Sequence, residues 1–302
     1  MTGDSLLRVG SRSSPLARAQ AEWIASQLAV CPALVWVKSE GDQDRTTELN
    51  QFGGLGVFTA ALHQALFDDR VDAAVHSLKD LPAGDEEGIT LCCVPVREDQ
   101  RDVLVARDGL TLDNLPEGAR IGTGSPRRAA QMLRYRPDLQ VAPLRGNVET
   151  RLRKLEEGEF DATLLALAGL NRLGLADVVT EILPPEVCLP AAGQGAIGIT
   201  IRRGDGRAEE ILSPLRDVRA AACASAERAA LHALGAGCHA PVGAMAQVES
   251  GRVRLRVRVL SHDGTQEIAG EDEGALAEAV DLGRRLAAEL LEQGAGPLVQ
   301  AS

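Results

Sequence analysis

Six arginines in this 302-residue sequence are suited to binding a polyanion, because most of them lie where a predicted strand gives way to a helix. They are Arg12, Arg127, Arg128, Arg145, Arg151 and Arg172. The N-terminus of a helix directs free N–H groups outward and favours anions, and a guanidinium group can bind a carboxylate through two parallel hydrogen bonds. A single arginine is at least as often a solvated surface residue as a ligand-binding one, so the prediction rests on the location that these arginines share. The whole chain has a formal net charge of −11, and its local positive charge therefore predicts a site for a small polyanion.

Lys79 and Asp80 close a predicted buried strand, Val71 to Leu78. An ion pair at a strand end is the common structural role for such residues. A carboxylate among cations can also stabilise a developing positive charge or handle a proton. His76 lies on the same strand, and we interpret it as a core or supporting histidine because nothing pairs it with a nucleophile.

Cys238 stands in the segment GAGCHAP, where two glycines precede the thiol and a proline follows it on a predicted loop. Most cysteines are buried and inert, but this setting predicts an accessible thiol that can form a covalent bond. Cys92, Cys93 and Cys223 are interpreted as core residues. No cysteine or histidine cluster has the spacing of a zinc site, so we predict no metal.

Two glycine-rich segments, Gly53 to Gly56 and Gly193 to Gly195, invite a nucleotide-binding interpretation. Neither is a P-loop, and neither has the strand–GxGxxG–helix setting of a dinucleotide site. We interpret residues 51–57 as a mobile loop, and Gly193-Gln194-Gly195 as a hinge segment between two lobes.

The overall composition excludes several classes of partner. A pI of about 5.0 argues against nucleic acid and against an anionic membrane surface. No secretory signal or transmembrane stretch is evident, and the six cysteines have no framework spacing. We expect a cytoplasmic protein with reduced thiols.

The elements that must position these residues alternate between strand and helix. In the first part of the chain the predicted elements are strand Leu6–Val9, a helix from Pro15 capped by Ser14, strand Ala33–Val37, helix Phe58–Phe67 and strand Val71–Leu78. The pattern restarts with strands Asp102–Ala106 and Ala119–Gly122, a second Ser-Pro cap at Ser125-Pro126, strand Gln140–Leu144, helix Val148–Leu155 and strand Ala162–Ala168. This alternation predicts two α/β lobes with mainly parallel sheets and a cleft between them.

The C-terminal part reads differently. Ala222 to Leu234 is helical, Arg252 to Leu260 alternates strictly as a half-buried antiparallel strand, and Leu276 to Leu291 is an amphipathic helix. This pattern predicts a small α+β domain. We expect residues 1–98 with 194–214 to form lobe 1, with strand Ala196–Ile201 returning to the first sheet. Residues 99–193 should form lobe 2, and residues 215–302 the third domain.

Seven segments together resemble the porphobilinogen deaminase family. They are SRSSPLA, AVHSLKDLP, GTGSPRR, LRGNVETRL, LALAGLNRLG, LPAAGQGAIGI and GAGCHAPVG, in the order in which the family has them. The resemblance covers nearly the whole chain. It implies two lobes like those of periplasmic binding proteins and a third domain whose cysteine, here Cys238, carries a dipyrromethane cofactor through a thioether.

The resemblance also implies the reaction. Such an enzyme condenses four porphobilinogen molecules head to tail, loses ammonia each time, and releases hydroxymethylbilane while the cofactor stays as primer. Each pyrrole ring carries an acetate and a propionate, which accounts for the arginines. Asp80 is then the carboxylate that stabilises the azafulvene cation left by deamination, and it also contacts the cofactor. We expect a monomer with no nucleic-acid or membrane partner.

The resemblance assigns the remaining residues to three groups. Arg12 and Lys79 act with Asp80 in catalysis, Arg12 by orienting or assisting a proton transfer for which its high pKa makes it a poor acid. The cofactor's carboxylates are held by Lys79, Thr123, Ser125, Arg127 and Arg128. The incoming ring and the growing chain are held by Arg12, Ser14, Arg145, Gly146, Arg151, Arg172 and Gln194.

This chain departs from the family pattern at a few positions. Gln51 and Leu55 stand where many relatives have lysines, so the loop is expected to add no charge. Gly124-Ser125 stands where many have Ser-Ser, which removes one hydroxyl contact. Two other functions fit the arginines: a two-lobed anion receptor without catalysis, which has no use for Asp80 or Cys238, and a paralogue that condenses a related pyrrole.

Overall fold

The computed structural model describes residues 6–37, 56–84, 86–237 and 239–300. They form two compact units, each described here by itself. Unit 1 comprises Met1–Arg97 with Ala196–Ala221, and unit 2 comprises Glu98–Gly195 with Ala222–Ser302.

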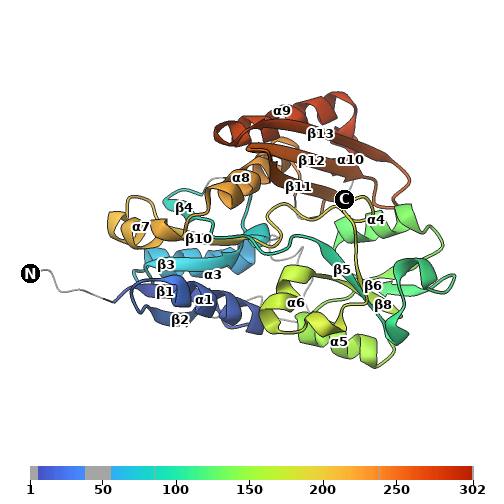
Figure 1. The fold of residues 1–302 in the computed structure, drawn as a ribbon, viewed down its shortest axis with the longest axis horizontal. Coiled ribbons are helices and arrows are strands. Elements are labelled where there is room, and N and C mark those ends of the chain that lie inside the picture. Colours follow the sequence, from blue (N-terminus) through green and yellow to red (C-terminus); the bar gives the residue numbers. More distant parts are fainter. Residues whose placement is uncertain (1–5, 38–55, 85, 238, 301–302) are drawn as a thin grey trace, which may run out of the picture. The chain divides into compact units, whose positions relative to one another are not determined.

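Unit 1 is built on a five-stranded sheet with the order β2-β1-β3-β10-β4 (Figure 1). The strands are β1 (Arg8–Arg12), β2 (Ala33–Val37), β3 (Ala73–Ser77), β4 (Ile89–Cys93) and β10 (Ile197–Arg202). β1 pairs in parallel with β2 and β3, whereas β10 runs antiparallel to both β3 and β4. The predicted return of residues 196–201 to the first sheet is confirmed, because residues 197–201 of β10 pair with β3.

The helices of unit 1 begin where the sequence signals are strongest. α1 (Pro15–Gln27) starts with Pro15, and the Ser14 hydroxyl accepts a hydrogen bond from the Ala17 N–H at 3.4 Å. Among the described residues, unit 1 also contains α3 (Gly56–Phe67) and α7 (Gly206–Leu212), and a short 3₁₀ turn (Leu78–Asp80) directly follows β3. β1 differs from the prediction, since it runs from Arg8 to Arg12, and Arg12 is the last residue of the strand rather than a residue beyond it.

Unit 2 repeats this sheet topology. Its first sheet has the order β7-β6-β8-β5-β9, with β5 (Asp102–Ala106), β6 (Arg120–Gly122), β7 (Gln140–Ala142), β8 (Ala162–Ala166) and β9 (Glu181–Ile182). β6 pairs in parallel with β7 and β8, and β5 runs antiparallel to β8 and β9. Its helices are α4 (Pro126–Tyr135), α5 (Val148–Glu156) and α6 (Leu167–Leu173). The α/β prediction is confirmed in both units, but each of these sheets is mixed rather than mainly parallel, because one strand in each, β10 in unit 1 and β5 in unit 2, runs antiparallel to both of its neighbours.

The C-terminal part of unit 2 is an antiparallel sheet of β11 (Val242–Glu249), β12 (Arg252–Leu260) and β13 (Glu267–Ala275) with helices α8, α9 and α10. α8 spans Val218–Ala233, α9 Ala279–Glu292 and α10 Ala295–Gln300, and α9 lies along this sheet (Figure 1). The alternation of β12 has the predicted effect: Val253 and Leu255 are buried, while Arg252 and Arg254 pair with Glu273 and Glu271 across β13. The predicted α+β layer is therefore present. Its separation as a third domain stays a prediction, because unit 2 includes both sheets.

Candidate functional site

A pocket of about 450 Å³, counted with its open mouth, lies at the strand ends of unit 1. It is formed by the end of β1, the start of α1, the end of β3 with its 3₁₀ turn, and α3. Its polar lining residues are Arg12, Ser14, Gln20, Thr59, His76, Ser77 and Asp80. Ligand crevices in α/β sheets form at such carboxyl ends of strands, and the predicted residues Arg12, Ser14 and Asp80 meet in this one pocket.

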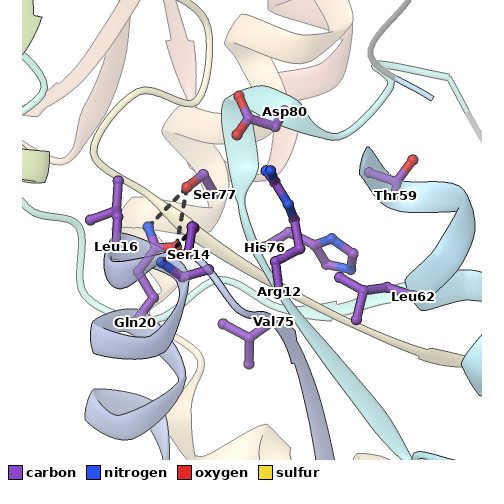
Figure 2. A pocket seen from close by; sticks show the side chains of 11 residues that line it. Arg12, Ser14, Leu16, Gln20, Thr59, Leu62, Val75, His76, Ser77 and Asp80 are labelled. Atoms are coloured by element: carbon purple, nitrogen blue, oxygen red, sulfur yellow. Dashed lines mark hydrogen bonds between the residues drawn. The ribbon is translucent and has the colours of Figure 1, made fainter. Parts of the chain in front are cut away.

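Arg12 and Asp80 are the charged pair of the pocket. The side chain of Arg12 extends from the end of β1 toward the carboxylate of Asp80, which comes from the turn after β3 (Figure 2). Burial raises the pKa of Asp80 above its usual value, and the positive charges of Lys79 and Arg12 oppose that rise without cancelling it. Leu78, fully buried, anchors the turn, and its N–H donates to the Ala196 carbonyl at 3.0 Å.

A histidine forms one wall of the pocket beneath this pair. His76 is buried, as predicted, and its Nε2 lies 2.9 Å from the Thr200 hydroxyl. Burial, followed by the charges of His63 and Arg12, lowers the pKa of His76 to about 3. The imidazole is therefore neutral at working pH, and it supplies a hydrogen-bonding wall rather than a second cation.

Two further residues of the pocket region were missed by sequence reasoning. His63 on α3 packs edge-on against His76, with ring centroids 5.4 Å apart, and its Nδ1 lies 2.6 Å from Glu86 Oε2. On the opposite side, Gln20 Nε2 donates to the Ser77 hydroxyl at 2.9 Å (Figure 2). A polar residue at an apolar helix position, such as Gln20 or His63, is the signal that could have revealed them.

In unit 2 the buried carboxylate of Asp102 pairs with Arg127 and Arg128, two arginines of the predicted site. Arg127 Nη1 donates to Asp102 Oδ2 at 2.6 Å, and Arg128 Nη2 donates to Oδ1 at 2.7 Å. All three side chains are buried. Sequence reasoning missed Asp102, whose only signal is an acid that opens an otherwise apolar strand.

Gln194 joins the same cluster. It is fully buried, and its Nε2 donates to Asp102 Oδ1 at 3.0 Å and to the Gln100 carbonyl at 2.8 Å. The thiol of Cys188 approaches Asp102 Oδ2 at 3.4 Å, and burial raises the pKa of that thiol to about 12. The structure therefore places Gln194 beside the arginines as part of their support.

Thr123 and Ser125 shape the start of α4. The Ser125 N–H donates to the Thr123 hydroxyl at 3.2 Å, and the Ser125 hydroxyl accepts from the Arg128 N–H at 3.5 Å, which caps the helix as the Ser-Pro signal predicted. Between them, a Cβ added at Gly124 would lie 3.1 Å from the Leu144 carbonyl oxygen. That narrow space agrees with glycine at this position.

The remaining predicted residues of unit 2 lie near the N-terminus of α5 and on α6. Arg145 is exposed, and Gly146 has a φ of +117°. Arg151 Nε donates to the Gly146 carbonyl at 2.8 Å, and burial, followed by the charge of Arg128, lowers the pKa of Arg151 to about 10. Arg172 Nη2 donates to the Gly195 carbonyl at 2.7 Å, and burial lowers its pKa as well.

The donor set suits a ligand rich in carboxylates. Two buried guanidinium groups share the single carboxylate of Asp102, and a third, Arg151, is half-buried close enough for Arg128 to lower its pKa. This excess of buried positive charge fits the acetate and propionate groups of a dipyrromethane. The predicted attachment residue Cys238 lies outside the described residues, as do Gln51 and Leu55. Among the described residues no cluster of three or more metal-ligating side chains occurs, and no helix there is long and apolar enough to span a bilayer.

Comparisons with known proteins agree with this geometry. Residues 7–210 match the family model for the dipyrromethane cofactor-binding domain of porphobilinogen deaminase, and residues 221–292 match the model for its C-terminal domain. The chain is 47% identical over 296 residues to a porphobilinogen deaminase of Desulforudis audaxviator, covering 96% of each protein. It is 46% identical to the porphobilinogen deaminase of Acidothermus cellulolyticus, covering 98% of this chain and 92% of that relative.

A solved periplasmic binding protein from Salmonella typhimurium with high arginine specificity is similar over 70% of this chain and 91% of its own, at 14% identity and a TM-score of 0.40. The family rests instead on the sequence matches, which run through both units and include the segments that carry Asp80 and the arginine pair. By that evidence the chain belongs to the porphobilinogen deaminase family.

Proposed function

We propose that this chain is a hydroxymethylbilane synthase, which joins four porphobilinogen molecules head to tail on a dipyrromethane primer bound to Cys238. The observation that carries the proposal is the Asp80 carboxylate, held beside Arg12 in a pocket of unit 1 in a chain of this family. In each cycle the C–N bond of the aminomethyl group breaks and ammonia leaves with the bonding electrons. A C–C bond then forms to the free ring carbon of the preceding pyrrole, which loses its proton.

Asp80 and Arg12 divide the electrostatic work in unit 1. Departure of ammonia leaves positive charge on the substrate's methylene carbon and ring. The Asp80 carboxylate stabilises that charge and accepts a hydrogen bond from the pyrrole N–H. Arg12 and Lys79 favour the ionised form of Asp80. Arg12 and Ser14 bind a substrate carboxylate, for which a guanidinium fork and a hydroxyl are suited.

Proton transfer to the leaving nitrogen is not a task for His76. Its lowered pKa leaves it neutral and unprotonated near pH 7. Arg12 orients the aminomethyl group, because a guanidinium holds its proton too tightly to be a good general acid. The substrate's amine is itself protonated at neutral pH, so breaking the C–N bond releases neutral ammonia directly and leaves the positive charge on the substrate.

The residues of unit 2 bind carboxylates. When bound, the dipyrromethane supplies the nucleophilic pyrrole carbon that begins the chain. We propose that Thr123, Ser125, Arg127 and Arg128 hold its carboxylates, as does Lys79 of unit 1, and that Arg145, Gly146 and Arg151 bind the incoming ring. Arg172 lines the path of the growing chain, and Gln194 supports the arginine pair. Support comes from the surplus of buried guanidinium groups in this unit.

The test compares the intact mass of the wild-type protein with that of Cys238→Ser, both made in a host that supplies porphobilinogen. We expect the mass of one dipyrromethane on the wild type and none on the variant, with turnover of porphobilinogen only by the wild type. A variant that keeps the added mass would show that another residue carries the primer. A wild type that carries no added mass and leaves porphobilinogen unchanged would refute the function and favour the anion receptor.

The paralogue that condenses a related pyrrole is separated by the product. Wild-type protein supplied with porphobilinogen should release a linear tetrapyrrole, detected by mass. We propose further that the protein acts in the cytoplasm as a monomer. The free thiols of Cys31, Cys92, Cys93, Cys188 and Cys223 suit a reducing compartment, and one chain carries every residue assigned here.

A further inference from the structure

Asp102 is a fully buried carboxylate of unit 2 to which none of the binding roles above applies. Its two oxygens receive different guanidinium groups. Oδ2 accepts from Arg127 Nη1 at 2.6 Å, and Oδ1 accepts from Arg128 Nη2 at 2.7 Å and Nε at 3.0 Å. One carboxylate therefore spaces and orients two arginines.

Backbone carbonyls fix the same two groups from their other sides. Arg127 Nη1 also donates to the Leu189 carbonyl at 2.7 Å, and Arg128 Nη1 donates to the Leu164 carbonyl at 2.9 Å. A planar guanidinium held at two places cannot rotate without losing charge-assisted hydrogen bonds. The orientation of both arginines thus depends on Asp102.

The charge balance of the cluster points to a ligand. Burial alone would raise the pKa of Asp102, but the charges of Arg127 and Arg128 outweigh it and hold that pKa far below its usual range. Asp102 stays ionised at any working pH, so it has no role as an acid or a base. It neutralises one of the two positive charges and leaves one that has no partner within the cluster.

We propose that Asp102 is a positioning residue for the carboxylate-binding site of unit 2. It fixes the direction of Arg127 and Arg128 and sets their combined charge at one unit, which a ligand carboxylate then neutralises. Asp102 itself is fully buried and acts only through the two arginines. The inference rests on the proposed function, because the carboxylates in question are those of the dipyrromethane.

Unit 1 contains a matched control. Asp72 is also a buried carboxylate between two arginines, with Arg8 Nη2 at 2.6 Å and Arg202 Nη2 at 3.2 Å. It immediately precedes β3, whereas Asp80 follows that strand, and it does not line the pocket. Asp72→Asn removes the same kind of ion pair without touching the proposed binding residues.

The experiment measures the melting temperature and, by intact mass, the fraction of folded chains that carry the dipyrromethane. Both variants should lower the melting temperature. Asp102→Asn leaves two buried guanidinium groups without their counter-ion, and Asp72→Asn removes the ion pairs that a buried carboxylate makes with the partly exposed Arg8 and Arg202. Only Asp102→Asn should lower the modified fraction, by about tenfold, since misdirected arginines lose charge-assisted bonds to the ligand. An unchanged fraction in Asp102→Asn, or an equal fall in both variants, would overturn the proposal.

A second variant keeps the test decisive if Asp102→Asn does not fold. Asp102→Glu, combined with Cys188→Ala to make room beside Oδ2, retains the charge and displaces the carboxylate by one methylene. Compared with Cys188→Ala alone, it should keep most of the modified fraction, because the retained carboxylate still pairs with both arginines and displaces them only slightly. It should lose about tenfold in kcat per modified chain, with KM for porphobilinogen within about twofold, because a misplaced reactant slows the chemical step. Unchanged kcat would show that Asp102 does not act by orienting Arg127 and Arg128. A wild type that neither carries the dipyrromethane nor consumes porphobilinogen would refute the proposed function instead.

Discussion

Arg12 and Asp80 line one pocket from the ends of neighbouring strands, and the charge of the arginine opposes the rise that burial imposes on the pKa of the carboxylate. The pKa of Asp80 is therefore raised less than burial alone would raise it, and the ionised carboxylate lies where it can stabilise a developing cation. Lys79, the residue before Asp80, acts in the same direction as Arg12.

The first prediction concerns the acidic limb of the pH–activity profile. Activity needs ionised Asp80, whose pKa lies above the usual value for an aspartate, so kcat should fall as pH drops through that raised pKa. Lys79→Gln removes a charge that lowers this pKa, and the limb should therefore move to higher pH. The profile of kcat against pH measures the shift, with Lys154→Gln as the control, since Lys154 pairs with the exposed Glu159. A limb that stays in place would show that Asp80 does not control it.

Asp80→Asn should separate activity from stability. Loss of the charge should lower kcat on the order of 10²–10³-fold. Because the folded-state pKa of Asp80 is raised, its ionisation opposes folding, and wild-type stability should decline as pH rises through the window between the unfolded and the folded pKa. Asp80→Asn should lack this decline and melt at a higher temperature than the wild type at pH 7. A lower melting temperature together with normal kcat would contradict both expectations.

Gly146→Ala tests the loop that presents Arg145 and Arg151. Its φ of +117° is strained for alanine, and the added Cβ would lie 2.6 Å from Thr150 Cγ2. We expect a loss of about 1–3 kcal/mol in the free energy of unfolding, measured by urea denaturation. Gly174→Ala also has a positive φ but has no atom within 4 Å of its Cβ, so its smaller loss isolates the clash. Adding Thr150→Ser should recover part of the difference, and no recovery would mean that backbone strain alone sets the cost.

Arg145→Lys should be harmful although it keeps the charge. Arg145 is exposed, so its substitution should leave the melting temperature unchanged. A lysine cannot bind a carboxylate through a planar fork, and we expect KM for porphobilinogen to rise by about tenfold with a smaller change in kcat. Steady-state kinetics measures both. A KM equal to that of the wild type would remove Arg145 from the ring-binding group.

Helix caps and uninterrupted apolar runs predicted the bounds of helices and strands well. Ser14-Pro15 and Ser125-Pro126 mark the starts of α1 and α4, and the apolar run after Asp102 marks β5 with the observed bounds. The end of β1 was misplaced because Gly10 and Ser11, which interrupt the apolar pattern, are fully paired with β2. Pairing between strands, rather than local composition, set that boundary.

In the candidate site, too, local signals predicted some residues, whereas others depend on contacts between distant parts of the chain. Arg12 and Asp80 could be predicted because each stands at a strand end, and strand ends are where α/β sheets bind ligands. The bond between Asp102 and Arg128 joins residues 26 positions apart, and the contact of His63 with Glu86 spans 23. No periodicity or motif encodes such partners. They follow only from the register of β5 in its sheet and from the packing of α3 against the five-stranded sheet of unit 1.

The position of β10 has a consequence for synthesis. This strand lies between β3 and β4, yet it begins at Ile197, more than a hundred residues after β4 ends at Cys93. During synthesis on the ribosome, the backbone N–H and C=O groups of β3 and β4 that pair with β10 have no partner until β10 has been made. In the same period β5 to β9, which are contiguous in the sequence, can form a complete sheet. The segment that carries Asp80 is therefore finished late, and a nascent chain arrested before residue 197 would expose an open edge ready for aberrant pairing.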